Sequence, residues 1–311
     1  EIEAYTIDNT KQETFKPYFQ DELFTALKPE VTSSEGIEDA DVKALVDNLL
    51  ADKEGYSKFR VGEYEAYRTV WSLQSELKTK APYNQWENPT GIYLKQGESC
   101  WVAVSGIKDD KVGVKIRNWV KSENGCSFSL RNGLNQITAT YEGNVFVDYY
   151  TDNFENAPNV NVHFINAPVR GYWDQETMTN ADWVAMLKPL KSDSSIIIVR
   201  SEHAQLAYPV CAWKQHCPTN VDSLMTLYQQ VQWAERDILG LKKYGREAKN
   251  RQLYFASTYG FMAATGVGAY CNVGSLGAIM TPDSKKFDFW GVGHEWGHNN
   301  QITPGFHWSG C

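Results

Sequence analysis

The first ninety or so residues carry apolar side chains at helical spacing. One set follows an acidic start and consists of Val42, Leu45, Val46 and Leu49. A second set consists of Tyr64, Tyr67, Trp71 and Leu77. Because intervals of three and four residues place side chains on one helical face, these sets predict two amphipathic helices. Gly55 ends the first helix and Pro82 closes the second, so we expect residues 1–88 to form a helical N-terminal region.

From about Gly91 the apolar positions alternate with polar or small ones. The alternating runs are Val102 and Val104; Val112, Val114 and Ile116; Cys126, Phe128 and Leu130; Val145, Val147 and Tyr149; and Val160, Val162 and Phe164. Turn sequences such as Glu123-Asn124-Gly125 separate the runs. Short alternating strands with such turns are typical of an antiparallel β-sandwich or jelly roll, which we expect over residues 89–191.

After about Ser192 the pattern becomes mixed. The predicted elements are a buried strand at 196–199, a helix from Leu224 to Ile238 capped by Thr219 or Asn220, and a strand at 251–257. A glycine-rich stretch from Gly260 to Gly277 follows, and we interpret its part around Gly266–Gly277 as a flexible cleft wall or an edge strand. A last helix carries His294. Residues 192–311 therefore form a third predicted domain, and the whole chain is expected to be an α+β multidomain protein.

Composition narrows the classes of partner. The chain has 311 residues, 42% of them hydrophobic and 22% charged, which is typical of a folded protein. Its net charge of −8 argues against nucleic acid or an anionic membrane surface as partner. No apolar run is long enough for a transmembrane segment. The chain opens Glu-Ile-Glu-Ala without a signal peptide, which fits either an intracellular protein or a mature one whose leader has been removed.

The six cysteines favour free buried thiols over a disulfide scaffold. They stand at positions 100, 126, 211, 217, 271 and 311. Cys211 and Cys217 are close enough in sequence to form a disulfide, and Cys100 and Cys126 lie in neighbouring strand-like runs. No Cys-x-x-Cys pair occurs, so a structural zinc site built on cysteines is not expected.

The sequence His294-Glu295-Trp296-Gly297-His298 carries the candidate chemistry. On a helix, residues four apart lie on the same face, so His294 and His298 project two imidazoles in one direction, as two positions of a zinc site require. Glu295 can reach a water on that metal without occupying a coordination position, and can take its proton as the water attacks a carbonyl. The pattern predicts Zn²⁺ as cofactor, His294 and His298 as metal ligands and Glu295 as the catalytic base.

A zinc site needs a third protein ligand. Gln301 and Pro304 stand where the metzincin pattern has Gly and His, which excludes that class. Three candidates remain: His307, Cys311, or a Glu on a helix beyond the end of this sequence.

The other histidines favour structural roles. His163 and His203 lie in strand-like runs, and His216 has no partner pair for a metal site. Most Trp and Tyr residues fall at periodic positions and are expected in the core rather than on a sugar-stacking surface.

The motif and its flanks resemble the viral-enhancin-like metallopeptidases, the sixtieth metallopeptidase family. The resemblance rests on residues 293–301 and Trp308-Ser309-Gly310, and upstream on Phe59-Arg60-Val61, residues 64–67, 88–93 and 130–138. It implies a gluzincin-type zinc metallopeptidase domain in which His294 and His298 bind zinc, Glu295 is the base, and a downstream Glu completes the ligands. Because that Glu would lie past Cys311, we expect the sequence to be truncated after the motif helix.

The resemblance also implies a substrate class and a location. Family members are mostly secreted or surface-anchored proteins of host-associated bacteria and resemble enzymes that cleave mucins. We therefore expect a monomeric, secreted or cell-surface-anchored zinc endopeptidase that hydrolyses mucin-like or other O-glycosylated proteins and contacts their glycans. The alternative is a non-catalytic glycan- or protein-binding module with an incomplete metal site.

Overall fold

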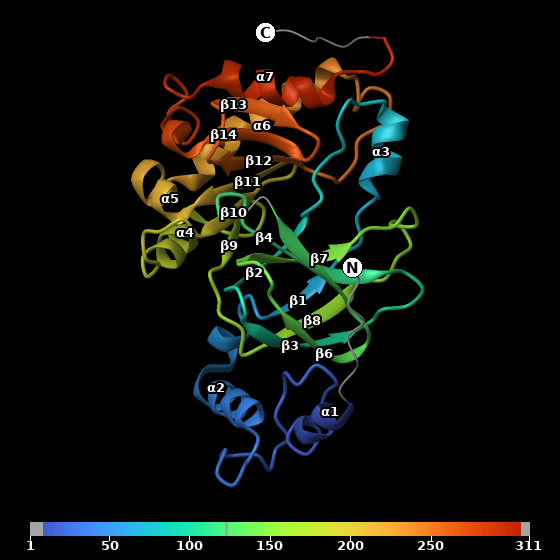
Figure 1. Ribbon diagram of the computed structural model, residues 1–311, viewed down its shortest axis with the longest axis vertical. Helices are drawn as coiled ribbons and strands as arrows, with labels where there is room; N and C mark the ends of the chain where they lie inside the picture. The colour runs from blue at the N-terminus through green and yellow to red at the C-terminus, as the bar shows by residue number, and fades with distance from the viewer. Residues whose placement is uncertain (1–8, 122–123, 306–311) are drawn as a thin grey trace. The chain divides into compact units, whose positions relative to one another are not determined.

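The structure is a computed structural model that describes residues 9–121 and 124–305 (Figure 1). The chain divides into two compact units. The first comprises residues up to 66, 88–117 and 124–171, and the second comprises 67–87, the short segment from 118 and the chain from 172 onward. The predicted three-part division at residues 88 and 191 stays a prediction. No helix in the described part of the chain is long and apolar enough to cross a membrane.

The first unit begins with helices α1 (Asn9–Phe15) and α2 (Ala40–Ser57). Asp39 caps α2, because its side chain accepts hydrogen bonds from the backbone N–H groups of Asp41 and Val42. The apolar face predicted for this helix is buried, and it packs with phenylalanines of the N-terminal loop and with strand residues such as Leu134. The first predicted helix is therefore confirmed, although it ends at Ser57.

The second predicted helix is wrong in its first half. Residues Val61–Tyr64 form strand β1, and only Val70–Leu77 form a helix, α3. β1 pairs antiparallel with a strand about one hundred residues later, with Tyr64 opposite Val160. Trp71, expected on the apolar face, is 62% exposed. The helical spacing arose by chance across a strand and a separate short helix, because local sequence cannot show a distant pairing partner.

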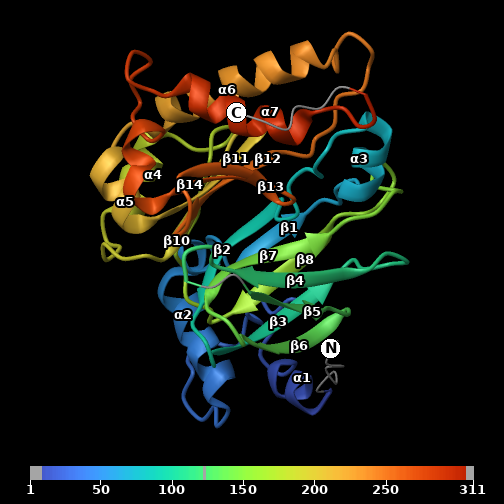
Figure 2. The same ribbon diagram turned by 45° about the horizontal axis from the view of Figure 1, so that its top comes forward.

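Two four-stranded antiparallel sheets complete the first unit, as predicted (Figure 2). Their orders are β1-β8-β3-β6 and β2-β7-β4-β5. The strands are β2 (Asn88–Leu94), β3 (Ser99–Ser105), β4 (Val112–Arg117), β5 (Gly125–Ser129), β6 (Gly133–Thr138), β7 (Gly143–Tyr149) and β8 (Val160–Ile165). Alternate side chains of both sheets enclose one apolar core that includes Val102, Val114 and Val162.

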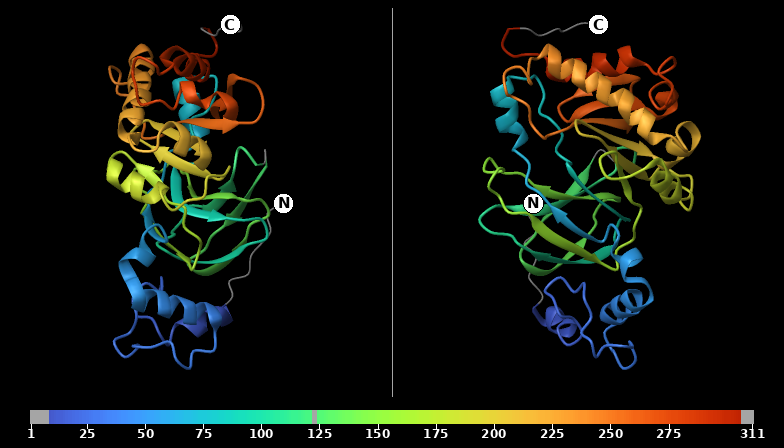
Figure 3. Two further views of the ribbon diagram at one scale, coloured as in Figure 1. Left: turned by 90° about the vertical axis from the view of Figure 1, so that its left-hand side faces the viewer. Right: turned by 180° about the vertical axis from the view of Figure 1, so that it is seen from behind.

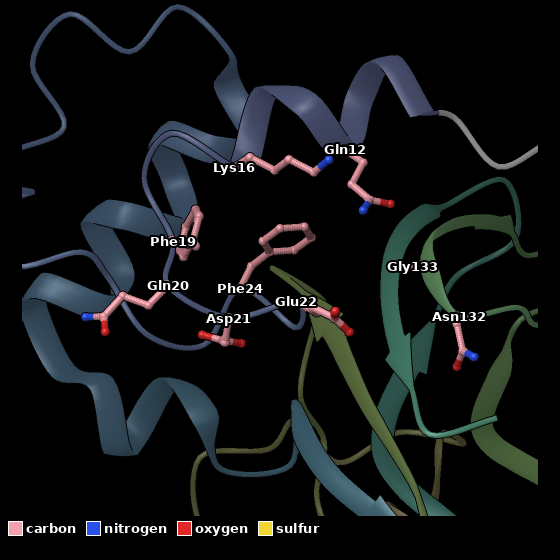
Figure 4. A pocket seen from close by; sticks show the side chains of 9 residues that line it. All are labelled: Gln12, Lys16, Phe19, Gln20, Asp21, Glu22, Phe24, Asn132 and Gly133. Atoms are coloured by element: carbon pink, nitrogen blue, oxygen red, sulfur yellow. The ribbon is translucent and has the colours of Figure 1, made fainter. Parts of the chain in front are cut away.

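A cavity of about 540 Å³ lies in the first unit, between the N-terminal loop and the β5–β6 turn (Figure 4). Two of its polar side chains, Asp21 and Asn132, already have partners within the protein. The Asp21 carboxylate accepts backbone N–H groups of Leu23, Thr25 and Ala26, and the Asn132 side chain bonds the backbone of Ile107. We therefore assign the cavity a structural role.

The second unit is built on a mixed six-stranded sheet with the order β13-β14-β12-β11-β10-β9. The strands are β9 (Tyr172–Asp174), β10 (Ile196–Arg200), β11 (Ala204–Pro209), β12 (Gln252–Ser257), β13 (Met262–Thr265) and β14 (Gly268–Asn272). Both strands predicted here, at 196–199 and 251–257, are confirmed. The glycine-rich stretch supplies β13 at the edge, its neighbour β14, and the short 3₁₀ helix η1 (Val273–Ala278).

Helices α4 (Asn180–Leu187), α5 (Val210–His216), α6 (Val221–Ile238) and α7 (Phe289–Asn300) also belong to the second unit. Of the two predicted caps for α6, Asn220 is the one whose side chain accepts a bond, from the Ser223 N–H. α6 (gold) and α7 (red) lie side by side over the sheet (Figure 3). The core beneath them contains buried aromatics of both helices and of β12, so the fold is α+β as expected.

Candidate metal centre

Helix α7 carries all three candidate site residues. Asp288 caps its N-terminus, where Oδ1 accepts the backbone N–H of Gly291 at 2.8 Å. Glycine is a poor helix former, so the glycines at 291, 293 and 297 lower the stability of the helix. The hydrogen bond of the Asp288 cap offsets part of this loss. Local sequence alone thus gives only a weak helix here, and its burial in the core must supply the rest of its stability.

Trp296 fixes the rotation of α7. Its side chain is fully buried, its Nε1–H donates to the Leu253 carbonyl at 3.2 Å, and its ring meets Tyr228 and Tyr254 edge-on. Residues two positions before and after it lie about 200° away around a helix, on the opposite side. The buried tryptophan therefore turns both motif histidines away from the core.

The two histidines converge. His294 Nε2 and His298 Nε2 lie 3.1 Å apart, and their ring planes are 85° to each other. Two nitrogens bound to one tetrahedral zinc ion at about 2.0–2.1 Å would lie about 3.3 Å apart. The spacing and the chemistry of this donor pair therefore fit a zinc ion bound by both Nε2 atoms after a shift of a few tenths of an ångström.

Glu295 lies beside the pair on the side of α7 that faces the edge strand β13. It is 8% exposed, and burial raises the pKa of its carboxyl, while His294 and the backbone N–H of Ala264 in β13 act to lower that pKa. One turn later, Asn299 donates to the Thr265 carbonyl at 2.7 Å. These two contacts hold the motif helix along the edge of the sheet.

The segment between α3 and β2 supports the end of α7. Lys80 N–H donates to the Gln301 carbonyl at 2.7 Å, and Ala81 N–H donates to that of Asn299 at 3.2 Å. Burial lowers the pKa of His298, and His294 and the Lys80 ammonium lower it further. A metal-binding histidine must be neutral, so this environment favours the form that binds.

Two neighbours of the histidines have roles that sequence reasoning missed. The exposed Trp290 ring stacks on His294, with centroids 4.6 Å apart and planes at 26°. The Gln301 side-chain amide lies 2.9 Å from Nδ1 of His298. Their spacings of four and three residues from the histidines were a usable signal, because such pairs meet on a helix.

The two glycines inside the motif region, Gly293 and Gly297, face α6. A Cβ at this position would lie 3.5 Å from Oε1 of Glu235 on α6, and one at Gly293 would lie 3.6 Å from Val231. The two glycines face α6, on another side of the helix from the histidines.

Only part of a zinc ligand set can be placed. Within residues 9–121 and 124–305, no group of three His, Cys, Asp or Glu side chains is arranged to hold a metal ion. His307 and Cys311 lie outside the described residues. The Glu expected beyond Cys311 stays a prediction.

The other histidines and cysteines among the described residues do not join the site. His163 is buried between the Tyr56 hydroxyl and the Leu23 carbonyl, and His203 is buried with Nε2 3.6 Å from Glu202. His216 ends α5. The cysteines at 100, 126, 211, 217 and 271 are free thiols, as expected, and the sixth is outside the described residues. Three of them are buried as expected, whereas Cys126 is half-buried and Cys211 is exposed.

Comparison with known proteins gives two related family matches. The model for peptidase M60, enhancin and enhancin-like, matches residues 171–311. The model for the N-terminal domain of M60-like peptidases matches residues 71–163. No curated protein matches the sequence.

Solved structures share the fold. A metallopeptidase from Bacteroides thetaiotaomicron aligns with 97% of this chain and 53% of its own, at 21% identity and a TM-score of 0.81. A metallopeptidase in complex with Tn antigen aligns with 80% of this chain and 49% of its own, at 22% identity and a TM-score of 0.72. The M60 catalytic domain of Clostridium perfringens ZmpC, in complex with the sialyl T antigen, aligns with 78% and 53%, at 15% identity and a TM-score of 0.65.

The chain thus spans about half the length of the solved structures that it matches. Its two family matches lie in the order N-terminal domain, then peptidase, and the second includes all of α7. The chain belongs to the family of enhancin and enhancin-like M60 peptidases.

Proposed function

We propose that this chain carries the zinc-binding helix of a metalloendopeptidase that cleaves mucin-like or other O-glycosylated proteins. The observation that carries the proposal is the convergence of His294 and His298 Nε2 atoms at 3.1 Å, with the Glu295 carboxyl beside them. Family membership supports the reaction class.

In this proposal each residue has one task. His294 and His298 hold the zinc ion through Nε2, together with a Glu that follows Cys311. The bound ion would polarise the peptide carbonyl and lower the pKa of a water molecule toward neutrality. Glu295 takes the proton of the attacking water and passes it to the departing amine, so no covalent intermediate forms. Burial raises the pKa of Glu295, which makes its carboxylate a stronger base.

The edge strand β13 is the proposed docking line for the substrate backbone. Within the described residues it pairs with β14 alone, and Glu295 and Asn299 of α7 contact it. An extended peptide can add to an open sheet edge through main-chain hydrogen bonds. Such a peptide would run alongside the helix that carries the histidines.

The substrate class rests on relatives. Two solved structures that share the fold are described as complexes with Tn antigen and with sialyl T antigen, which supports glycan contacts for this chain as well. We propose the same class of O-glycosylated substrate here, and a secreted or surface-anchored location that gives access to it.

The test uses the full-length protein that contains this chain. Glu295→Gln removes the base but leaves both histidines, so we expect cleavage of a mucin-type glycoprotein to fall at least about a hundredfold while zinc content stays at one ion per chain. Glu247→Gln, which changes an exposed carboxylate, is the matched control and should cleave normally. Metal analysis and electrophoresis of the digested glycoprotein are the two readouts.

Two results would contradict the proposal. One is unchanged cleavage by the Glu295→Gln protein. The other is glycan binding by the unaltered protein without bound zinc and without cleavage, which would instead identify a binding module with an incomplete metal site.

A further inference from the structure

We propose that Gln301 is a positioning residue for the metal site, with its side-chain oxygen accepting the Nδ1–H of His298. This inference rests on the proposed function, because it concerns how His298 is presented to zinc. Gln301 touches neither substrate nor metal in this proposal. It acts through the orientation and the tautomer of the histidine.

The tautomer of His298 decides which of its ring nitrogens can bind a metal. The Nε2 atoms of His298 and His294 face each other at 3.1 Å, so Nε2 is the nitrogen directed at the metal position. A nitrogen that binds a metal carries no proton, and a neutral imidazole must then keep its proton on Nδ1. That N–H is a donor and needs an acceptor, as metal-binding histidines usually have.

The Gln301 side-chain amide faces Nδ1 of His298 through its nitrogen. Nδ1 of His298 lies 2.9 Å from Nε2 of Gln301, an arrangement in which the amide donates and Nδ1 carries no proton. The other amide atom, Oε1, is buried and has no hydrogen-bond partner among the described residues. A buried acceptor without a partner is unfavourable, because it has lost its hydrogen bonds to water.

A turn of the amide supplies the acceptor that the Nδ1–H group needs. The nitrogen and oxygen of a side-chain amide have nearly the same shape, so a half-turn of the Gln301 amide exchanges them without moving neighbours. Oε1 then faces Nδ1 and accepts its proton, which leaves Nε2 of His298 free for zinc, and the amide NH2 takes the position that Oε1 held. The metal-bound protein is therefore expected to hold the turned amide.

The backbone makes Gln301 suited to this task. It is the first residue beyond α7, with φ −56° and ψ 138°, so its side chain can turn back to the ring three residues earlier. Its carbonyl is held by Lys80 N–H, and the next residue, Ile302, pairs with Thr79. The amide therefore extends from a fixed point rather than from a free helix end.

The experiment measures the affinity of the full-length protein for Zn²⁺ by competition with a chromophoric chelator. Gln301→Met removes both amide groups at similar size, and Gln301→Glu keeps only acceptors. We expect the Met variant to bind zinc about 10–100-fold more weakly, the usual effect of losing such a partner, and the Glu variant to bind at least as tightly as the unaltered protein. Gln230→Met, on the exposed side of α6, is the control and should bind normally.

The Glu variant separates positioning from general stability. A residue that only stabilises the end of α7 would give similar affinities in both variants, whereas an acceptor role is rescued by the carboxylate alone. Equal zinc affinity in the Met variant and the unaltered protein, or equal losses in the Met and Glu variants, would overturn the inference. Failure of the unaltered protein to bind zinc would instead overturn the proposed function, and this inference with it.

Discussion

At the scale of single residues, Trp296 and the two motif histidines have different roles on the same helix. Trp296 packs in the core, and the histidines carry the nitrogens of the proposed metal site. The tryptophan is fully buried among Tyr228 and Tyr254, and the imidazoles lie on the opposite side of α7. The side chain with no part in the proposed chemistry therefore decides where the chemical groups point. Its indole N–H also has a partner, so its burial leaves no polar group unsatisfied.

Replacing this anchor should cost far more stability than replacing the exposed tryptophan of the same helix. We expect Trp296→Ala to lower the free energy of unfolding by about 3–5 kcal/mol, because it leaves a large cavity in the core. Trp290→Ala, at a side chain that is 75% exposed, should lower it by less than about 1 kcal/mol. Urea denaturation followed by circular dichroism measures both, and similar losses in the two variants would show that Trp296 is not the anchor.

At the scale of elements, α7 is held on two sides. Glu295 and Asn299 bind the backbone of β13, while Gly293 and Gly297 face α6. The histidine face is left between these contacts. Because each face has its own partner, the effect of a substitution in α7 depends on which face it alters.

Two glycine substitutions in α7 test this assignment of faces. A Cβ at Gly297 would meet Glu235 at an ordinary 3.5 Å, so Gly297→Ala should gain about 0.5–1 kcal/mol of helix stability and leave zinc affinity unchanged. A Cβ at Gly291 would lie 2.4 Å from the capping carboxylate of Asp288, so Gly291→Ala should destabilise the protein. Thermal unfolding and zinc titration give the comparison. A loss of zinc affinity in Gly297→Ala would mean that this glycine does face the metal.

Some helices and strands could be predicted from the sequence, and others could not. Strands of the sandwich were predicted because alternation is a local pattern, and α6 because its apolar face and Asn220 cap are local too. The helix expected from Tyr64 failed because β1 forms only through its pairing with β8. Trp290 and Gln301 were missed as neighbours of the histidines, since spacing shows that side chains can meet but not that they do.

At the scale of the whole molecule, residues distant in sequence meet in buried polar contacts within each unit. In the second unit the fully buried Glu87 forms an ion pair with Arg251, whose Nη1 lies 3.2 Å from Oε2 of Glu87. This pair connects the segment between α3 and β2 to the start of β12. In the first unit His163 of β8 donates through Nδ1 to the Leu23 carbonyl and accepts from the Tyr56 hydroxyl of α2. Removing one member of such a contact leaves the other buried and unpaired, which is costly.

The histidine contact predicts a pH dependence of stability. Burial lowers the pKa of His163 to about 4 from an ordinary value of 6.5. Between these values the unfolded chain binds more protons than the folded one, so the free energy of unfolding falls as pH falls below 6.5. We expect His163 to account for a loss of about 2 kcal/mol between pH 7 and pH 5.

Urea unfolding at the two pH values measures this loss. His163→Gln should be less stable at pH 7, yet lose less stability on acidification than the unaltered protein. The same decrease in both proteins would contradict the assignment of a buried neutral His163.

The sequence by itself determined the chemistry that this protein can present: two imidazoles four residues apart with a carboxylate between them, and a resemblance to one peptidase family. It also determined the strands and helices with a clear local periodicity, such as β4, β12, α2 and α6, because periodicity and caps are properties of neighbouring residues. Only the tertiary structure decided which way the motif helix is turned, through Trp296 in the core, and which neighbours hold its histidines. The physical reason is that burial and hydrogen bonding between distant segments act on the folded chain as a whole, and no local pattern records them.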